Sequence, residues 1–258
     1  MQIISIIAAG NQTSVQAVLT PKYHQIIRIS KHKMISGKVK MKSRFIYVIL
    51  AIILVILVNP FIRHTGKIGY FFTTILITMI PLASYHALTE ERNRAIIILL
   101  IAAPFVILDG INMFFINRYL MVVAYSFATI LYFYIVVLSV RNLLSQRVIT
   151  ANLIYCAISI YLLIGIMWAG LYTVLEGISP GSFSGTSETA DLLYFSFVTL
   201  TTVGFGDMAP LSILAKRLAI FEAAMGGIYM AIIIAMIVGR YMTLQAEQDS
   251  ENETTLKK

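Results

Sequence analysis

The 258-residue chain has a composition that excludes an ordinary water-soluble globular protein. Hydrophobic residues make up 59% of it and charged residues only 12%, against about 25% charged residues in average soluble domains. The net charge of +8 would suit nucleic acid, but the basic residues flank the apolar runs, as they do in the loops of membrane proteins. We therefore expect a lipid environment and no nucleic-acid partner.

Residues 1–44 form a basic segment that contains eight Lys and Arg residues and precedes the first long apolar run. The first residues lack the basic start of a signal peptide, so we expect no cleavage there. The segment is predicted to be a cytoplasmic tail. Two interpretations stay open: the tail is solvated, or it lies on anionic lipid through its positive charge.

Six apolar runs of a length that suits membrane-spanning helices follow this tail. Because an α-helix rises 1.5 Å per residue, about 20 residues cross the roughly 30 Å of hydrocarbon. Polar pairs such as Asp109-Gly110 and Arg141-Asn142 are where we expect helices to end. The expected spans are 45–62, 68–88, 95–112, 118–140, 149–175 and 213–242. The predicted fold class is an all-α membrane protein with six transmembrane helices.

The distribution of basic residues predicts how these spans are oriented. An even number of spans places both termini on one side of the membrane. Fifteen of the 20 Lys and Arg residues fall on that side and five on the other. Since cytoplasmic loops carry the excess of basic residues, both termini are predicted to be cytoplasmic in a multi-pass protein of the cell membrane.

A short segment between the fifth and sixth spans combines a helix with an irregular stretch. Residues 190–200 are too few to span the membrane and predict a re-entrant pore helix. Irregular backbone at membrane depth is tolerated only where protein buries it or water reaches it. The stretch that follows, 202–206, is therefore expected to line a water-accessible path.

This stretch reads Thr202-Val203-Gly204-Phe205-Gly206 and has the composition of a carbonyl cage. The carbonyls of Thr202, Val203, Gly204 and Phe205 could replace the water around a potassium ion, with the Thr202 hydroxyl as the innermost ligand. Glycines at 204 and 206 allow the positive φ angles that turn the carbonyls toward one axis. Val203 and Phe205 are expected to point away from that axis. One chain supplies one such strand, so a closed cyclic oligomer follows.

Together with its neighbours, this stretch resembles the signature of the potassium channel superfamily. The motif is Thr-Thr-Val-Gly-Phe-Gly-Asp at 201–207, and the likeness covers about residues 150–245. The layout resembles a bacterial two-transmembrane pore module with four helices added in front. Further positions that contribute to the likeness are Asp191 to Ser196, Pro210, Glu222 and Gly226.

The resemblance implies a fold, an activity and an assembly. It implies a fourfold-symmetric homotetramer that conducts potassium ions passively, with no organic cofactor. The span at 149–175 becomes the outer helix and the span at 213–242 the inner helix that lines the pore. The implied divisions are a tail at 1–44, four leading helices at 45–142, a pore domain at 143–245 and a short cytoplasmic tail at 246–258.

The residues predicted to support the filter depart from the family pattern at several points. These positions are Phe195, Val198, Thr201 and Asp207. Phe205 stands where most members carry tyrosine, and Phe195 stands where many carry tryptophan, so the hydrogen bond between those two groups cannot form. Val198 replaces a glutamate that supports the aspartate in some members. We therefore expect apolar packing to hold the filter at these points.

The fourth predicted span lacks the charges of a voltage sensor. Residues 119–140 contain no Lys or Arg; Arg118 and Arg141 only bracket the run. A sensor helix needs basic residues that move through the membrane field. The four leading helices therefore resemble a voltage-sensor layout in number but not in charge, and opening is expected to depend only weakly on voltage. Asp109 could be a relic counter-charge of such a sensor, but we prefer the interpretation that it ends the third helix together with Gly110.

Two features of the last span are candidates for gating or packing. Gly226 and Gly227 interrupt it, and glycine inside a helix costs about 0.5–1 kcal/mol relative to alanine. The family places a hinge here, but tight packing against the pore helix explains the pair equally well. Glu222 lies one turn earlier, where a carboxylate is costly, and it could form a hydrogen bond behind the filter.

Three other functions were weighed against the channel. A non-selective cation channel would need a damaged filter, which this sequence does not have. A secondary transporter would show two related halves, whereas the sequence has one re-entrant segment. An enzyme would need a nucleophile with its base, or metal ligands, within the spans, and the four histidines are scattered. The sequence therefore predicts a channel and no enzyme.

Overall fold

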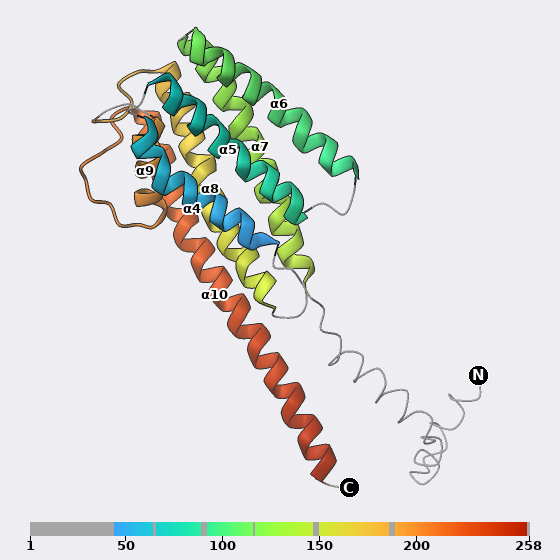
Figure 1. Ribbon diagram of the computed structural model, residues 1–258. Helices are drawn as coiled ribbons and strands as arrows, with labels where there is room; N and C mark the ends of the chain where they lie inside the picture. The colour runs from blue at the N-terminus through green and yellow to red at the C-terminus, as the bar shows by residue number, and fades with distance from the viewer. Residues whose placement is uncertain are drawn as a thin grey trace, which may run out of the picture. The chain divides into compact units, whose positions relative to one another are not determined.

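The computed structural model describes residues 44–256 except 64–65, 89–91, 116, 147–149 and 186–188, so the predictions for the basic tail lie almost wholly outside it. The described residues fold into α-helices, with a single isolated β-bridge between Phe183 and Pro210 (Figure 1). The helices are α4 (Phe45–Arg63), α5 (Lys67–Leu88), α6 (Arg92–Phe114), α7 (Arg118–Ser145), α8 (Ala151–Ile178), α9 (Thr189–Leu200) and α10 (Ile213–Leu256).

Five of these helices are long and apolar enough to cross a membrane, namely α5, α6, α7, α8 and α10. The helix α4 has a shorter apolar part, Phe45–Val58. The all-α class and the membrane location predicted from the sequence are thereby confirmed. A count of six spans stays a prediction, because it depends on α4.

The prediction that Asp109 and Gly110 end the third helix is wrong. The helix α6 continues through both residues to Phe114, and Gly110 is not among the glycines with positive φ. Asp109 is only 2% exposed and accepts a hydrogen bond of 2.6 Å from the Thr74 hydroxyl of α5. This hydrogen bond satisfies the Asp109 carboxyl group inside the helix bundle, so α6 can continue past it.

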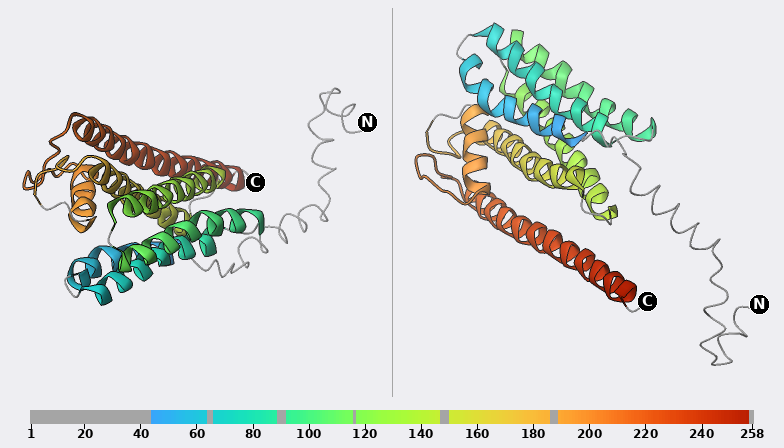
Figure 2. Two further views of the ribbon diagram at one scale, coloured as in Figure 1. Left: turned by 90° about the horizontal axis from the view of Figure 1, so that it is seen from above. Right: turned by 60° about the horizontal axis from the view of Figure 1, so that its bottom comes forward.

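Two other helices also run past their predicted ends. The helix α7 passes Arg141 and Asn142 and ends at Ser145, where Gln146 caps it and donates a hydrogen bond of 2.8 Å to the Asn142 side chain. The predicted border between 142 and 143 therefore falls inside α7. The helix α10 has 44 residues and continues through most of the predicted tail at 246–258 (Figures 1 and 2).

The helices α7 and α8 lie side by side and are joined by a connection of only a few residues, 146–150. Two glycines of α8 allow the close approach. A Cβ atom at Gly177 would lie 2.4 Å from Val122 Cγ2, and one at Gly170 would lie 2.7 Å from Thr129 Oγ1. The Thr150 hydroxyl caps the start of α8 by accepting a hydrogen bond of 3.2 Å from Leu153 N.

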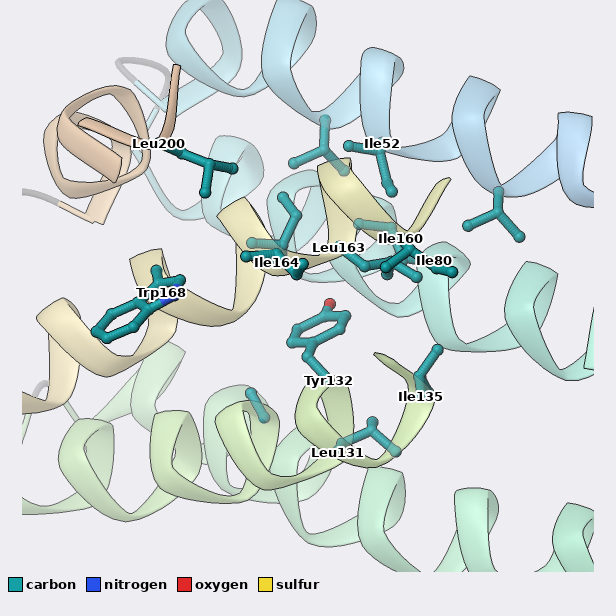
Figure 3. Packing of buried hydrophobic residues seen from close by; sticks show 14 of the residues in the cluster. Ile52, Ile80, Leu131, Tyr132, Ile135, Ile160, Leu163, Ile164, Trp168 and Leu200 are labelled. Carbon is teal, nitrogen blue, oxygen red and sulfur yellow. The ribbon is translucent and has the colours of Figure 1, made fainter. Parts of the chain in front are cut away.

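The core of the bundle lies between α7, α8 and the helices α4 and α5. Figure 3 shows Tyr132 of α7 among Ile160, Leu163 and Ile80, all of which are buried. The Tyr132 hydroxyl donates a hydrogen bond of 3.1 Å to the carbonyl of Ile77 on α5, which satisfies the only polar group of this side chain. The leading helices and α8 therefore share one continuous apolar core.

We expect the substitution Gly177→Ala to destabilise the protein by about 1–3 kcal/mol, because the added methyl group would overlap the Val122 side chain. Helix propensity alone would favour alanine by about 0.5–1 kcal/mol. The matched control is Gly239→Ala in α10, where a Cβ atom meets nothing within 4 Å. Thermal unfolding in detergent should show a loss for Gly177→Ala only; equal midpoints for both variants would contradict the close approach.

Candidate functional site

The short helix α9 organises the site. It has 12 residues, starts one residue before the predicted 190–200, and carries Asp191 in its first turn, where a negative charge is favourable. It packs against α8 and α10, and the residues that it buries are Leu192, Phe195, Ser196 and Leu200. Figure 2 shows α9, in orange, between the yellow α8 and the red α10.

Phe195 belongs to a cluster of three aromatic rings. Its ring centroid lies 5.3 Å from that of Tyr172 on α8 and 5.2 Å from that of Phe183 in the loop after α8. The Tyr172 and Phe183 centroids are 5.2 Å apart, and all three pairs meet edge to face. Such pairs add about 0.5–1.5 kcal/mol each beyond the apolar area that they bury. The ring contacts of Phe195 therefore hold α9 against α8.

In the backbone after α9, the sign of the φ angle alternates from residue to residue. Thr202, Gly204 and Gly206 have φ angles of 59°, 58° and 79°, whereas Val203 and Phe205 do not have positive φ. Thr202 is the only non-glycine residue with positive φ in the described part of the chain. A non-glycine residue in this conformation is strained by about 1–2 kcal/mol, so the surrounding structure must impose it.

Hydrogen bonds from the end of α9 hold this strained segment in place. The amide of Thr202 donates to the Thr199 carbonyl and that of Val203 to the Val198 carbonyl, each at 3.0 Å. The Thr201 hydroxyl donates to the Phe197 carbonyl at 2.6 Å. Val198, whose side chain lacks a carboxylate, thus acts through its backbone. These hydrogen bonds to the end of α9 therefore determine where residues 202–206 begin.

A polar contact that the sequence analysis missed joins α9 to Asp207. The Tyr194 hydroxyl donates a hydrogen bond of 2.8 Å to Asp207 Oδ2. This hydrogen bond is the main reason why the pKa of the Tyr194 phenol is raised above its ordinary value. The expectation of mainly apolar packing concerned Phe195, Phe205 and Val198, and this hydrogen bond adds a polar contact beside them. Tyr194 is 41% exposed and is a polar partner of Asp207.

The side chains of Val203 and Phe205 face an open apolar groove of about 300 Å³. Their exposed fractions within the single chain are 54% and 70%. The groove is also lined by Ile56, Ala190, Leu193, Tyr194, Phe197, Val198 and Thr201. Both side chains therefore lie beside α9, but the chain alone does not cover them.

The loop after α8 holds the segment that follows Asp207. The Glu176 carboxylate accepts hydrogen bonds from the amides of Gly181 and Ser182 at 2.6 and 2.9 Å. The Leu211 amide then donates to the Ser182 carbonyl at 2.7 Å, and the Ala209 amide donates to the Ser184 hydroxyl at 2.7 Å. Both ends of the strained segment are thereby fixed.

Glu222 of α10 is fully buried and contacts two other helices. Its Oε1 atom lies 2.5 Å from the Ser196 hydroxyl of α9, and its Oε2 atom lies 2.5 Å from the Tyr172 hydroxyl of α8. The sequence marks Glu222 as a costly carboxyl group in a span, but it does not reveal that Ser196 and Tyr172 are its partners. Their separation in the chain explains this, since no local pattern connects them.

The two glycines of α10 differ in their surroundings. A Cβ atom at Gly226 would lie 2.1 Å from the Leu200 carbonyl oxygen at the end of α9, whereas one at Gly227 meets nothing within 4 Å. The Tyr161 hydroxyl of α8 donates a hydrogen bond of 3.2 Å to the same Leu200 oxygen. Gly226 therefore serves close packing, and α10 runs through both glycines without a break.

Comparison with known proteins covers the part of the chain around this site. Residues 149–243 match a family described as an ion channel. Two pore potassium channel a of Oryza sativa subsp. japonica is 37% identical over 78 residues, which are 30% of this chain and 21% of that protein. The inward rectifier potassium channel Kirbac3.1 of Paramagnetospirillum magnetotacticum is 34% identical over 68 residues, 26% of this chain and 21% of that protein. The chain thus spans about a fifth of these relatives, and no solved structure matches it.

We expect Gly226→Ala to destabilise the packing of α10 on α9 by about 1–3 kcal/mol, because its methyl group would overlap a backbone oxygen that cannot move aside. Gly227→Ala is the matched control and should be neutral or slightly stabilising. Thermal unfolding of the two purified variants checks this. A larger loss for Gly227→Ala would refute the assignment of Gly226 to close packing.

Proposed function

We propose that the chain is one subunit of a homotetrameric channel that conducts potassium ions passively and selectively; residues 149–243 match an ion-channel family, and potassium channels are among the relatives that the chain resembles. The family is one of ion channels and not of enzymes. The filter residues in this proposal are Thr202, Val203, Gly204, Phe205 and Gly206.

The alternating φ angles at 202–206 are the observation that carries the proposal. In an extended strand, successive carbonyls point in opposite directions. A φ angle that changes sign from residue to residue departs from this pattern, and we propose that it turns the carbonyls to one side. Four carbonyls and the Thr202 hydroxyl then form a row of oxygen ligands that can replace the hydration shell of a potassium ion. The positive φ angles at Gly204 and Gly206 occur at residues whose lack of a side chain allows them.

The distribution of burial supports an assembly of several chains. The spanning part of α8 is 67% buried within the chain, whereas that of α10 is 11% buried. The exposed apolar residues of α10 include Ile220, Phe221, Ile228 and Ile232. Since one strand of carbonyls cannot enclose an ion, we propose that four copies place these α10 faces around one axis.

The same proposal covers the membrane topology and the voltage dependence. The 19 residues of α4 cover about 28 Å at 1.5 Å per residue, so α4 is proposed as a sixth span. The excess of basic residues near the termini supports a cytoplasmic location for both. Between Arg118 and Arg141, α7 has no basic residue, so we propose weak voltage dependence. We propose separate roles for the leading helices, predicted at 45–142 and ending with α7 at Ser145, and for the pore domain, predicted at 143–245 and beginning with α8.

Reversal potentials of the purified protein in liposomes or planar bilayers test the selectivity. Under opposed potassium and sodium gradients, we expect the reversal potential to lie close to the potassium equilibrium value, because all the proposed ligands are present. Barium, a divalent cation close to potassium in size, should block the flux. Equal permeability to both cations would favour the alternative, a non-selective cation channel of the same architecture.

Removal of the Tyr194 hydroxyl should weaken the outer end of the filter. In Tyr194→Phe, we expect potassium current to decay faster in low potassium, by about threefold or more, because Asp207 loses a hydrogen-bond donor in every subunit. The matched control is Tyr119→Phe, whose side chain is exposed and has no hydrogen bond from its hydroxyl to any described residue. Unchanged decay in Tyr194→Phe would show that the hydrogen bond does not support the filter.

A further inference from the structure

Glu222 joins three helices in the apolar interior. It lies on α10, its hydroxyl partners Ser196 and Tyr172 lie on α9 and α8, and all three side chains are fully buried. Both oxygen–oxygen distances are 2.5 Å. The Ser196 hydroxyl has a further neighbour, the Gly165 carbonyl of α8 at 2.8 Å. Four oxygen-bearing groups therefore form one chain of contacts.

The number of hydrogens in this chain depends on the state of Glu222. Ser196 has one hydroxyl hydrogen and cannot donate it fully to both Glu222 and Gly165. If Glu222 carries a proton, it donates to Ser196, which then donates to the Gly165 carbonyl. The Tyr172 hydroxyl meanwhile donates to the second oxygen of Glu222. In this arrangement, every hydrogen has one acceptor, and the network contains no net charge.

The surroundings of Glu222 offer nothing that would neutralise an ionised carboxylate. Among the described residues, none of its contacts is a Lys, Arg or His side chain. On α8, the Tyr172 hydroxyl contacts Glu222 and the Tyr161 phenol interacts with it electrostatically. On α9, the Tyr194 phenol is bound to Asp207 instead. A buried charge without a partner is among the costliest states in a membrane protein.

The other buried carboxyl group of this region makes the opposite kind of contact. Glu176 accepts hydrogen bonds from two backbone amides, which can donate but never accept. Glu176 must therefore offer two acceptor oxygens. The hydroxyl partners of Glu222 can reverse their direction. The two glutamates thus respond differently to replacement by glutamine, which keeps the shape but has one donor and one acceptor end.

We propose that Glu222 is a neutral carboxylic acid and acts as a positioning residue for the filter. Its proton links α10 through Ser196 to the Gly165 carbonyl and so fixes α9 against α8 and α10. One turn further along α10, Gly226 packs on the Leu200 carbonyl, directly before the filter segment. Glu222 thereby sets the position of α9, and the position of α9 determines where Thr202 lies. This part of the proposal rests on the proposed function of residues 202–206.

Infrared spectroscopy of the full chain in lipid tests the protonation directly. We expect the native protein to show a carboxylic-acid carbonyl band at neutral pH that is absent from Glu222→Gln. The band should persist in Glu176→Gln, the matched control with the same chemical change. If Glu222→Gln loses no such band, Glu222 is ionised and the proposal is overturned. This outcome does not depend on whether the protein conducts ions.

Potassium flux from liposomes tests the positioning role. Glu222→Gln can still donate to Ser196 and accept from Tyr172, so we expect a flux within about twofold of the native protein. Glu222→Val loses both hydrogen bonds and should lower the flux by about tenfold or more. A Gln variant as poor as the Val variant, or a Val variant equal to the native protein, would overturn the role. No flux from the native protein would refute the proposed function instead.

Discussion

The backbone amides of the segment after α9 depend on the last turn of that helix. In a membrane, each polar backbone group must find a partner within the protein or reach water. Val203 and Thr202 find theirs at the carbonyls of Val198 and Thr199, so the strained stretch is an extension of α9. Everything that fixes α9 therefore also fixes that stretch. The contacts that do so are aromatic toward α8, through Phe195, and polar toward α10.

Hydropathy was sufficient to predict the helices, because a run of about 20 apolar residues has few alternatives to a spanning helix. The ends of the helices were less predictable. Asp109 was interpreted as a terminus because a carboxylate in a span is costly, but its hydrogen bond to Thr74 of α5 satisfies it. The helix α7 likewise continued past Arg141. A polar residue in a membrane sequence can thus mark a helix end or a contact between helices, and only its partner distinguishes the two.

The candidate site was predictable where its chemistry is local and not where it crosses the chain. Residues 202–206 are recognisable in the sequence because glycine stands at 204 and 206, where the backbone adopts positive φ. Tyr194 and Asp207 are 13 residues apart, and their contact depends on where the strained stretch turns. Glu222 was recognisable as an anomaly, yet its partner Tyr172 lies 50 residues away. One local sign existed for Tyr194: it precedes Val198 by one helical turn and so shares its face of α9.

Around α9, the polar side chains are buried within the chain and the exposed surface is apolar. This contrast bears on assembly. The buried polar side chains around α9 find partners within the chain, as Glu222, Ser196 and Glu176 do. The exposed surface around residues 202–206 is instead apolar, formed by Val203, Phe205 and one face of α10. In lipid, burying apolar surface gives little hydrophobic stabilisation, so close packing must supply the attraction between subunits. An assembly around residues 202–206 therefore needs α9 to be rigid beforehand, because a mobile helix would present no fixed shape to pack against. Under the proposed function, the polar contacts within each chain thus come before the apolar contacts between chains.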